Sequence, residues 1–524
     1  MKNKVCIFSN VGHFTEIFEI QLEIAQKHLD KGDEVDFLFC DGTIPICEIN
    51  IKKELDTCLY CIGRRNNGLS LLKGKAKNFN IFSFTKIADF KVIKSAKIKF
   101  KSLKELKDYK FLGYDLGQSV CSSISDIDRE YQPSVKDYST EIRKFIQSSV
   151  RIYLTSRRYI ELMKPDIMYI YNGRHALEKA AIAACTAKRI NYYTHEFAYN
   201  GGYVLCKNTQ PQDHRFYTKQ AEKLWKCKKS SIEQKRQIGD IFFKKKLGIK
   251  QGSISVKKKG KSIEITHNAD ESINHIKYVD RLPDSWDKNN QNVLIFQSSI
   301  FEEHTSPEFH NYDKIYSCQL AAIKSIVQEF KDINSNFMFH LRLHPSFNFW
   351  NNKTQELREY LELGNKYTNL KLIKPEENIS SYFLMDNASK VIAFRSTAAI
   401  ESAYRKIPTI VLVKEPYNAF GCVYKPTNHQ EVIELINNRD LKPKDSVDCL
   451  KFGYLQMSYG IIPKYYQRDP QLSYQENWGI FKGKVIKPNS QYTFILNLLH
   501  RQKLRLVYEL MNSIHIKILK RYYN

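Results

Sequence analysis

The sequence predicts an α/β protein built from two doubly wound domains that face one another across a cleft, followed by a basic C-terminal helix. Short apolar runs typical of buried parallel strands alternate with amphipathic segments of helical length. At 524 residues the chain is also too long for one ordinary hydrophobic core. A polar stretch separates two such series, so we expect an N-terminal domain over 1–270, a linker over 271–291, a C-terminal domain over 292–488 and a terminal helix over 489–524.

The first domain opens with a strand, a helix and a second strand, which together form a β–α–β unit. A loop containing Gly12 follows the first strand, and Gly32-Asp33 forms a turn after the helix. Residues of about 62–110 are basic and carry no assignable periodicity. The elements we expect are strand Lys4–Ser9, helix Glu16–Lys31, strand Glu34–Cys40, helix Ser139–Met163, strand Asp166–Tyr171, helix His175–Lys188 and strand Asn191–Thr194.

The second domain repeats this alternation of strand and helix. Its expected strands are Asn292–Phe296, Phe337–Leu343, Leu370–Ile373, Lys390–Phe394 and Thr409–Val413, and its expected helices are Ile315–Phe330, Ile379–Asp386 and Thr397–Tyr404. Ligands of open α/β sheets bind outside the carboxyl ends of the strands. Two such domains that face one another therefore predict a ligand cleft between them.

The chain carries 82 lysine and arginine residues against 56 aspartate and glutamate residues, a formal charge of +26. Such a balance suits nucleic acid, an anionic membrane surface, an acidic substrate, or a lysine-rich solvated surface. The sequence has no zinc-finger spacing, RNP motif or basic zipper, so we expect no nucleic-acid partner. It has no run of about 18 apolar residues for a membrane span, and its start is typical of a strand rather than a signal peptide. We therefore expect a cytoplasmic protein whose 12 cysteines are reduced.

Two strand ends in the second domain carry side chains able to hold an anion. The first ends on a basic pair separated by one residue, so both side chains point to the same face. The second runs into an Arg-Ser-Thr turn at a helix start, where hydroxyl groups cap N–H groups that also bind phosphate. A glutamate one helical turn further on can reach a ribose hydroxyl. The candidate donor-binding residues are Arg342, His344, Arg395, Ser396, Thr397 and Glu401.

The stretch from Val293 to Pro426 resembles the donor-binding half of bacterial GT-B glycosyltransferases that build capsule and lipopolysaccharide glycans. It is also similar to polyol-phosphate transferases and capsule Kdo transferases. The matching pieces are Leu343-His344-Pro345, Lys374–Tyr382, Arg395-Ser396-Thr397 and Ile400-Glu401, with Tyr171–Arg174 and His195-Glu196-Phe197 in the first domain.

This resemblance implies a GT-B fold, with donor phosphate held by His344, Ser396 and Thr397 and ribose held by Glu401. It implies a nucleotide-sugar donor, such as a UDP- or CMP-sugar, and a glycan or lipid-linked acceptor. The transfer chemistry would require no cofactor, because basic side chains take the electrostatic role of a metal.

A catalytic base is expected in the first domain, where a carboxylate or histidine must reach the acceptor hydroxyl. Gly12 would let an acceptor approach the backbone, and Asn172 and Arg174 would shape the cleft floor. A polar residue near a helix start can equally complete a helix cap, and we give that interpretation of His13 equal weight. The candidate bases are His13, Asp41, His195 and Glu196.

Four cysteines, Cys40, Cys47, Cys58 and Cys61, lie within 22 residues and end in a CxxC pair. Four thiolates can hold a structural zinc ion, or less readily an iron–sulfur cluster. The first spacing is wider than that of most zinc sites, so four independent small apolar residues are the alternative. We predict a structural zinc ion.

The last residues, from Ser490, combine basic side chains with an apolar stripe at helical spacing. Such a helix suits peripheral attachment to the anionic inner face of the cell membrane. The alternative is a terminal helix that packs back across the first domain.

Together these patterns predict a glycosyltransferase that transfers a sugar to a growing, lipid-linked cell-surface polysaccharide. Three alternatives stay open. They are a polyol-phosphate transferase of the CDP-glycerol type, a nucleotide-sugar epimerase that needs no acceptor, and a non-enzymatic polyanion-binding protein.

Overall fold

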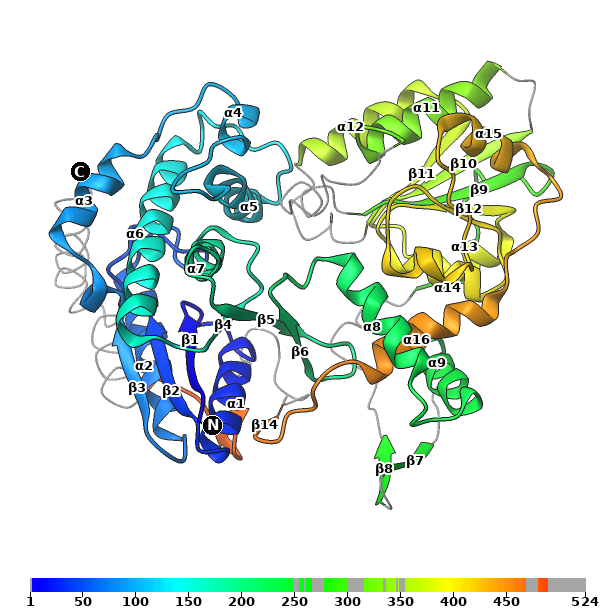
Figure 1. Cartoon of the computed structure of the whole chain (residues 1–524). Helices are drawn as coiled ribbons and strands as arrows, with labels where there is room; N and C mark the ends of the chain where they lie inside the picture. The colour runs from blue at the N-terminus through cyan, green and yellow to red at the C-terminus, as the bar shows by residue number, and fades with distance from the viewer. Residues whose placement is uncertain are drawn as a thin grey trace, which may run out of the picture.

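The computed structural model describes residues 2–247, 254–258, 261–265, 278–298, 315–332, 336–344, 347, 354–467 and 479–488. The predicted terminal helix over 489–524 lies outside the described residues, as do Pro345 and the first part of the predicted linker. Two mainly parallel sheets, each covered by helices, form the two halves of the molecule (Figure 1). The predicted α/β class with two Rossmann-like domains is therefore confirmed.

The first sheet has the strand order β3-β2-β1-β4-β5-β6, and only β6 runs antiparallel to its neighbour. Helices cover both faces, so its central strands are continuous apolar runs. Phe8 packs beneath α6 and α7 on one face, and Ile7 packs beneath α1 on the other. The strands are β1 (Lys4–Ser9), β2 (Glu34–Phe39), β3 (Ala76–Asn80), β4 (Ile167–Tyr171), β5 (Asn191–Phe197) and β6 (Tyr203–Lys207), and the helices are α1 (Ile17–Asp30), α5 (Leu116–Asp128), α6 (Ser139–Met163) and α7 (Ala176–Ala187).

The segment without assignable periodicity contains regular structure. It holds most of helix α2 (Leu55–Ser70), strand β3, and helices α3 (Ile87–Ser95) and α4 (Leu103–Lys107). Strand β3 lies at the edge of the sheet, and its side chains are partly buried or exposed. An edge strand of this kind carries no apolar run, which is why periodicity did not reveal it.

The second sheet has the order β11-β10-β9-β12-β13, and all its strands are parallel. The sheet again separates two hydrophobic cores, one under the helices on each face. The strands are β9 (Gln291–Phe296), β10 (Phe337–Arg342), β11 (Leu370–Ile373), β12 (Lys390–Ala393) and β13 (Thr409–Val411), and the helices include α11 (Gln319–Asp332), α12 (Gln355–Lys366), α13 (Ser381–Asn387), α14 (Thr397–Tyr404) and α15 (His429–Asn437).

Both sheets reverse their strand order beside their first strand, between β1 and β4 in one and between β9 and β12 in the other. At such a switch point the helices that follow the two strands lie on opposite faces, which opens a crevice at the carboxyl ends. The fold therefore positions two ligand crevices before any side chain is considered.

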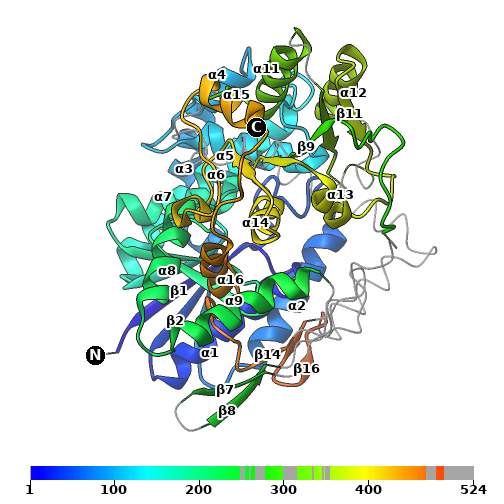
Figure 2. The same ribbon diagram turned by 90° about the vertical axis from the view of Figure 1, so that its right-hand side faces the viewer.

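The chain crosses between the halves twice, which differs from the predicted domain boundaries. Helices α8 (His214–Lys226) and α9 (Ile232–Lys246) pack with α16 (Cys449–Ser458) in a core shared with the second sheet (Figures 1 and 2). Burial of Phe242 and Ala221 in that core places α8 and α9 with the second half, although they precede residue 270.

The segment after α16 returns to the first half, ahead of the predicted boundary at 488. Ile461 pairs with Tyr203 as an antiparallel bridge, and the carboxylate of Glu23 accepts hydrogen bonds from the backbone N–H groups of Lys464, Tyr465 and Tyr466. A small sheet of β14 (Tyr466–Gln467), β15 (Ile480–Phe481) and β16 (Lys484–Val485) follows.

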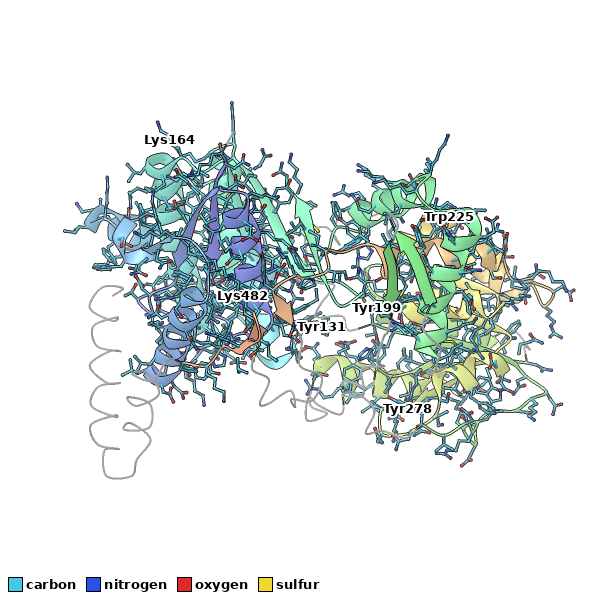
Figure 3. The ribbon with its side chains drawn as sticks, turned by 90° about the horizontal axis from the view of Figure 1, so that it is seen from below. Tyr131, Lys164, Tyr199, Trp225, Tyr278 and Lys482 are labelled. Carbon is cyan, nitrogen blue, oxygen red and sulfur yellow. The ribbon has the colours of Figure 1, made fainter. Side chains whose placement is uncertain are left out.

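Two hydrogen bonds also connect the halves. The hydroxyl of Tyr131 donates to Glu359 on α12 over 2.6 Å, and the N–H of Gln355 donates to Glu130 over 3.0 Å. Tyr131 and Tyr199 both lie where the two halves approach one another (Figure 3). Among the described helices, none has the length and apolar content needed to cross a bilayer.

Candidate active site

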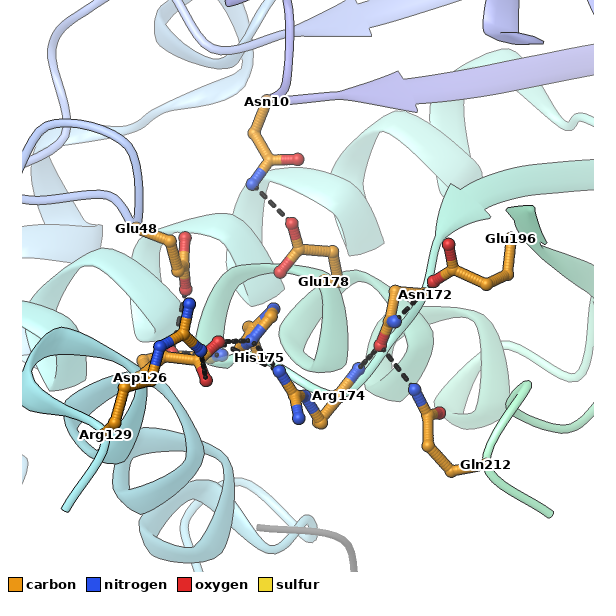
Figure 4. Close-up of polar contacts among 12 residues, drawn as sticks. Asn10, Glu48, Asp126, Arg129, Asn172, Arg174, His175, Glu178, Glu196 and Gln212 are labelled. Atoms are coloured by element: carbon orange, nitrogen blue, oxygen red, sulfur yellow. Dashed lines mark hydrogen bonds and ion pairs between the residues drawn. The ribbon is translucent and has the colours of Figure 1, made fainter. Parts of the chain in front are cut away.

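A group of polar side chains converges at the switch point of the first sheet (Figure 4). We call Asn10, Glu48, Asp126, His175 and Glu178 the carboxylate cluster. They come from the end of β1, the loop after β2, helix α5 and the start of α7, which directly follows β4. The sequence prediction named none of these five residues, although it selected the neighbouring segment at Asn172 and Arg174.

Two glutamates in the carboxylate cluster, Glu48 and Glu178, have raised pKa values. The amide of Asn10 donates to Glu178 over 2.7 Å, and the hydroxyl of Ser123 donates to Glu48 over 2.8 Å. Burial raises the pKa of each glutamate to about 7, and the charge of Glu178 contributes to the shift at Glu48. The second carboxylate oxygen of Glu178 is buried and has no hydrogen-bond partner among the described residues. Each of these two glutamates therefore gains or loses its proton near neutral pH.

A histidine and an aspartate form a dyad beside this pair. Nε2 of His175 lies 2.6 Å from the Asp126 carboxylate, which also accepts from Arg174 over 2.9 Å. Although burial opposes it, the hydrogen bond and charge of His175, with Arg174, hold the pKa of Asp126 well below its usual range. An ionised Asp126 keeps the proton on Nε2, so Nδ1 of His175 is left to accept a proton.

The predicted cleft-floor residues connect the carboxylate cluster to the junction of the two halves. The side-chain amide of Asn172 donates to Glu196 over 2.6 Å, and its oxygen accepts from the N–H of Arg174 and from Gln212. Asn172 has a φ of 48° and Gly173 a φ of 88°, so the chain turns sharply after β4. This turn brings Arg174 and His175 to the edge of the sheet.

Two of the predicted bases, His195 and Asp41, are held in structural contacts. His195 is fully buried on β5, 3.3 Å from the amide of Gln21, and burial lowers its pKa to about 3. The carboxylate of Asp41 accepts from the N–H groups of Thr43 and Phe82, and so holds a turn. In this structure the burial of His195 and the hydrogen bonds of Asp41 give both side chains a structural role, and a part in catalysis stays a prediction for each.

The loop that contains Gly12 and His13 packs against α2. A side chain at Gly12 would meet Cys61, and His13 lies against the ring of Tyr60 with 4.7 Å between ring centroids. Burial and the charge of Arg64 lower the pKa of His13. The loop is thus fixed by packing, and among the predicted bases it is Glu196 whose side chain bonds to the cleft-floor residue Asn172.

The Arg395-Ser396-Thr397 turn of the second half, the predicted donor site, lies at the other switch point. Ser396 caps α14 by accepting from the N–H of Ala398 over 3.2 Å, and its carbonyl accepts from Tyr417 over 2.9 Å. Arg395 has a φ of 33°, which turns the chain from β12 into the helix. The hydroxyl of Thr397 is therefore presented at the first turn of α14, where helix N–H groups attract anions.

A cavity of about 260 Å³ joins this turn to the first half. Its polar lining includes Arg395, Thr397, His214 and Glu415, and Nδ1 of His214 lies 3.4 Å from the Glu415 carboxylate. Aromatic side chains complete the walls: Phe197, Tyr199, Tyr217, Tyr417, Phe452 and Tyr459. Such a mixture suits a sugar phosphate, which presents charge at one end and apolar sugar faces at the other.

Gln297 follows β9 directly, beside the β12 turn. The residue is only 3% exposed, and neither atom of its amide has a hydrogen-bond partner among the described residues. A buried unpaired amide is costly, so Gln297 is a candidate to contact a polar group of a ligand at this switch point. No sequence signal distinguished this glutamine.

The remaining predicted donor residues differ in what they contact. The guanidinium of Arg342 turns inward and donates to the carbonyl oxygens of Lys374, Glu377 and Ile379, so in this structure it holds the loop after β11. Its contact with a donor phosphate stays a prediction. Glu401 is 7% exposed and accepts from the hydroxyl of Tyr382 over 2.8 Å.

His344 follows β10 at the carboxyl edge of the second sheet, where a donor phosphate was predicted. Desolvation and the neighbouring charge of Arg342 lower its pKa, so the ring is neutral at physiological pH. A neutral histidine can still donate one N–H to phosphate. Its role stays a prediction.

The four cysteines of the predicted metal site line one small cavity together with Lys53. Burial raises the pKa of Cys40 to about 12 and raises the pKa of Cys61, which keeps these thiols protonated. In the part of the chain that the structure describes, no three His, Cys, Asp or Glu side chains are arranged to hold a metal ion. The ammonium of Lys53, which is buried beside the thiols, also opposes a dication.

Zinc at these cysteines therefore stays a prediction that elemental analysis can decide. If zinc binds, protein purified without chelator contains about one zinc per chain, and Lys53→Met increases the affinity because a competing positive charge is lost. Lys52→Met, at the adjacent exposed lysine, is the control. Absence of zinc and iron from both proteins would show that the cysteines are packing residues.

Comparison with known proteins adds solved structures of low similarity. No protein-family model matches the sequence, and no curated protein is similar to it. A β-Kdo 2,4 transferase, KpsC of Thermosulfurimonas dismutans, is 10% identical with a TM-score of 0.33, over 55% of this chain and 78% of that chain. The UDP-GlcNAc 2-epimerase of Neisseria meningitidis bound to UDP-GlcNAc is 14% identical with a TM-score of 0.26, over 88% and 95%.

The S. aureus MnaA–UDP structure is 12% identical with a TM-score of 0.25, over 97% and 98% of the two chains. The similar structures thus include Kdo transferases and UDP-GlcNAc 2-epimerases.

Proposed function

We propose that this protein is a glycosyltransferase that moves a sugar from a nucleotide-sugar donor to a hydroxyl group of a growing cell-surface glycan. The observation that supports this proposal is the opposite chemistry of the two switch points. One has a histidine–aspartate dyad and a glutamate pair that accept protons, and the other has an anion-binding turn. A group transfer with a phosphate leaving group needs both.

The donor phosphate lies at the turn of Arg395 and Thr397 in this proposal. Charge grows on the leaving phosphate as its bond to the sugar breaks, and the guanidinium, the hydroxyl and the first N–H groups of α14 stabilise that charge. The cavity there is smaller than the roughly 300–1,000 Å³ of pockets that enclose whole ligands. It therefore holds the reacting sugar and phosphate, with the nucleoside extending beyond it.

The acceptor hydroxyl lies at the carboxylate cluster. His175 takes the proton of that hydroxyl through Nδ1 while Asp126 keeps the ring oriented, which is the geometry of a base held by a third group. The acceptor oxygen then forms the new bond to the sugar, and the nucleotide leaves with the electrons of the broken bond. Arg174 holds Asp126 in its ionised form throughout.

One observation favours a nucleotide-sugar epimerase as the second candidate. The unpaired oxygen of Glu178, with a pKa of about 7, is able to abstract a proton from a sugar carbon. An epimerase converts the donor sugar without any acceptor. Formation of an isomeric nucleotide sugar by the protein alone would therefore select this candidate over transfer.

Thermal stability in the presence of a panel of nucleotide sugars tests the donor site. A true donor at 100 times its Kd adds about 2.7 kcal/mol to the free energy of unfolding, which raises Tm by several degrees. Arg395→Ala should abolish the rise. Arg439→Ala, at an exposed arginine of the same half, should leave it unchanged. Equal binding by both variants, or no binding by the wild type, would contradict the donor assignment.

A further inference from the structure

The proposed function leaves one surface of the first half without a role. Helix α3 lies on its outer side, away from the second half (Figure 1). The turn Ile81–Phe84, which follows β3, leads into α3. Two large apolar side chains are exposed here, Phe82 at 57% and Ile87 at 89%. We call the surface made by Phe82, Ile87, Lys91, Lys94 and Lys99 the α3 surface.

Helix α3 presents two different faces. Asp89 and Ile93 point inward, where Asp89 accepts two hydrogen bonds from Arg158 at 2.8 and 2.9 Å. Ile87, Lys91 and Lys94 recur at the spacing i, i+4, i+7 and are exposed, so they share the outer face. Because the single carboxylate of α3, Asp89, lies on the inner face, the outer face carries no negative charge.

The charge of the surrounding segment is strongly positive. Residues 86–110 contain nine lysines and three acidic residues. Besides Asp89, the acidic residues are Glu105, paired with Lys97 at 2.7 Å, and Asp108, paired with Lys104 at 2.7 Å. Lys91, Lys94 and Lys99 form no ion pair with any described residue, and all three are exposed. Their charges are thus available to an external anion.

We propose that the α3 surface docks on an anionic lipid bilayer, with Ile87 and Phe82 entering the interface and the lysines contacting acidic headgroups. The exposed aliphatic side chain of Ile87 favours a bilayer over a nucleic acid as the partner. Burial of Ile87 among acyl chains is favourable, whereas an aliphatic side chain gains neither stacking nor phosphate contact on nucleic acid. This inference goes beyond the proposed transfer and does not depend on it.

The position of the α3 surface suits an acceptor carried by the membrane. Phe82 lies two residues after the carboxyl end of β3, and its N–H donates to Asp41, just beyond the end of β2. The carboxylate cluster lies beyond the carboxyl ends of β1 and β4 in the same parallel sheet. A bilayer on the α3 surface therefore adjoins the sheet edge at which the acceptor is proposed to react.

Sedimentation with vesicles tests the proposal on the full chain. Wild-type protein should bind vesicles containing 30% phosphatidylglycerol in phosphatidylcholine at low salt, and not pure phosphatidylcholine vesicles or free glycerol phosphate. Lys91→Gln/Lys94→Gln/Lys99→Gln should lower partitioning by about 10²-fold. Ile87→Ser/Phe82→Ser should lower it by about tenfold, because apolar insertion is lost.

Matched variants separate this surface from the rest of the basic chain. Lys223→Gln/Lys226→Gln/Lys229→Gln removes the same charge from exposed lysines of the second half, and Leu162→Ser removes an exposed apolar side chain of α6. Both controls should bind vesicles as the wild type does. Equal losses in controls and test variants would overturn the proposal. Loss of vesicle binding in the lysine variant but not in the Ile87→Ser/Phe82→Ser variant would also overturn it, because that result indicates a polyanion site. So would loss of vesicle binding only when residues 500–524 are deleted.

Discussion

His175→Ala is expected to lower the rate of sugar transfer by about 10³-fold, within the range that a positioned general base contributes. Without the imidazole no group oriented by Asp126 remains to take the proton of the acceptor hydroxyl. The measurement is kcat with the nucleotide sugar that gives the largest thermal shift. Donor binding should be retained, because the donor turn belongs to the second half.

A second histidine–aspartate pair provides the control. His28 on α1 lies 2.7 Å from Asp33, close to the amino-terminal edge of the first sheet. His28→Ala removes the same type of contact and should leave transfer intact. Transfer unaffected in folded His175→Ala, or equally reduced in both variants, would remove His175 from the mechanism.

The pH dependence provides an independent measure of the same site. Ionisation of the Glu48–Glu178 pair adds negative charge near His175, so transfer should rise as pH rises through about 7. Stability should change in the opposite direction. The raised pKa values mean that the folded state binds more protons than the unfolded state between about pH 4.5 and 7, so the free energy of unfolding falls over that window.

Arg64→Ala is expected to destabilise the first half by about 3–5 kcal/mol, the cost of leaving a buried partner charge unpaired. Arg64 and Glu19 are both fully buried and form an ion pair between α2 and α1. The guanidinium also donates to the carbonyl oxygens of Gly12 over 2.9 Å and of Ile486 over 3.1 Å. One side chain therefore fixes α1, the loop after β1 and the returning C-terminal segment.

Denaturant unfolding followed by circular dichroism measures this loss. Arg236→Ala, at an exposed arginine of helix α9, carries the same change in helix propensity and should cost less than about 0.5 kcal/mol. Arg64→Met combined with Glu19→Gln should recover part of the stability, because it leaves no unpaired charge. If Arg64→Ala is no more destabilising than the control, the ion pair does not hold these segments together.

The sequence by itself determined most strands of both sheets, but not the edge strands β3 and β6 of the first sheet. Helices Ser139–Met163 and Thr397–Tyr404 and strand Leu370–Ile373 have the predicted bounds, and most of the other predicted elements differ by a few residues. Periodicity of apolar residues is a local property, so it reports which face a helix buries and where a buried strand runs. The Arg395–Thr397 turn could be found for the same reason, because a strand, a cap and a helix follow one another directly.

The tertiary structure alone decided which polar residues meet. The carboxylate cluster takes its members from four separate elements, and nothing near Asp126 or Glu48 in the sequence announces His175. Burial also decides whether a polar side chain can reach a ligand, and His195 lies fully buried in the core. Sequence spacing predicts the face of the strand from which Arg342 projects. It does not predict that three backbone carbonyl oxygens accept hydrogen bonds from its guanidinium. Those partners are brought together by long-range packing, which no local pattern encodes.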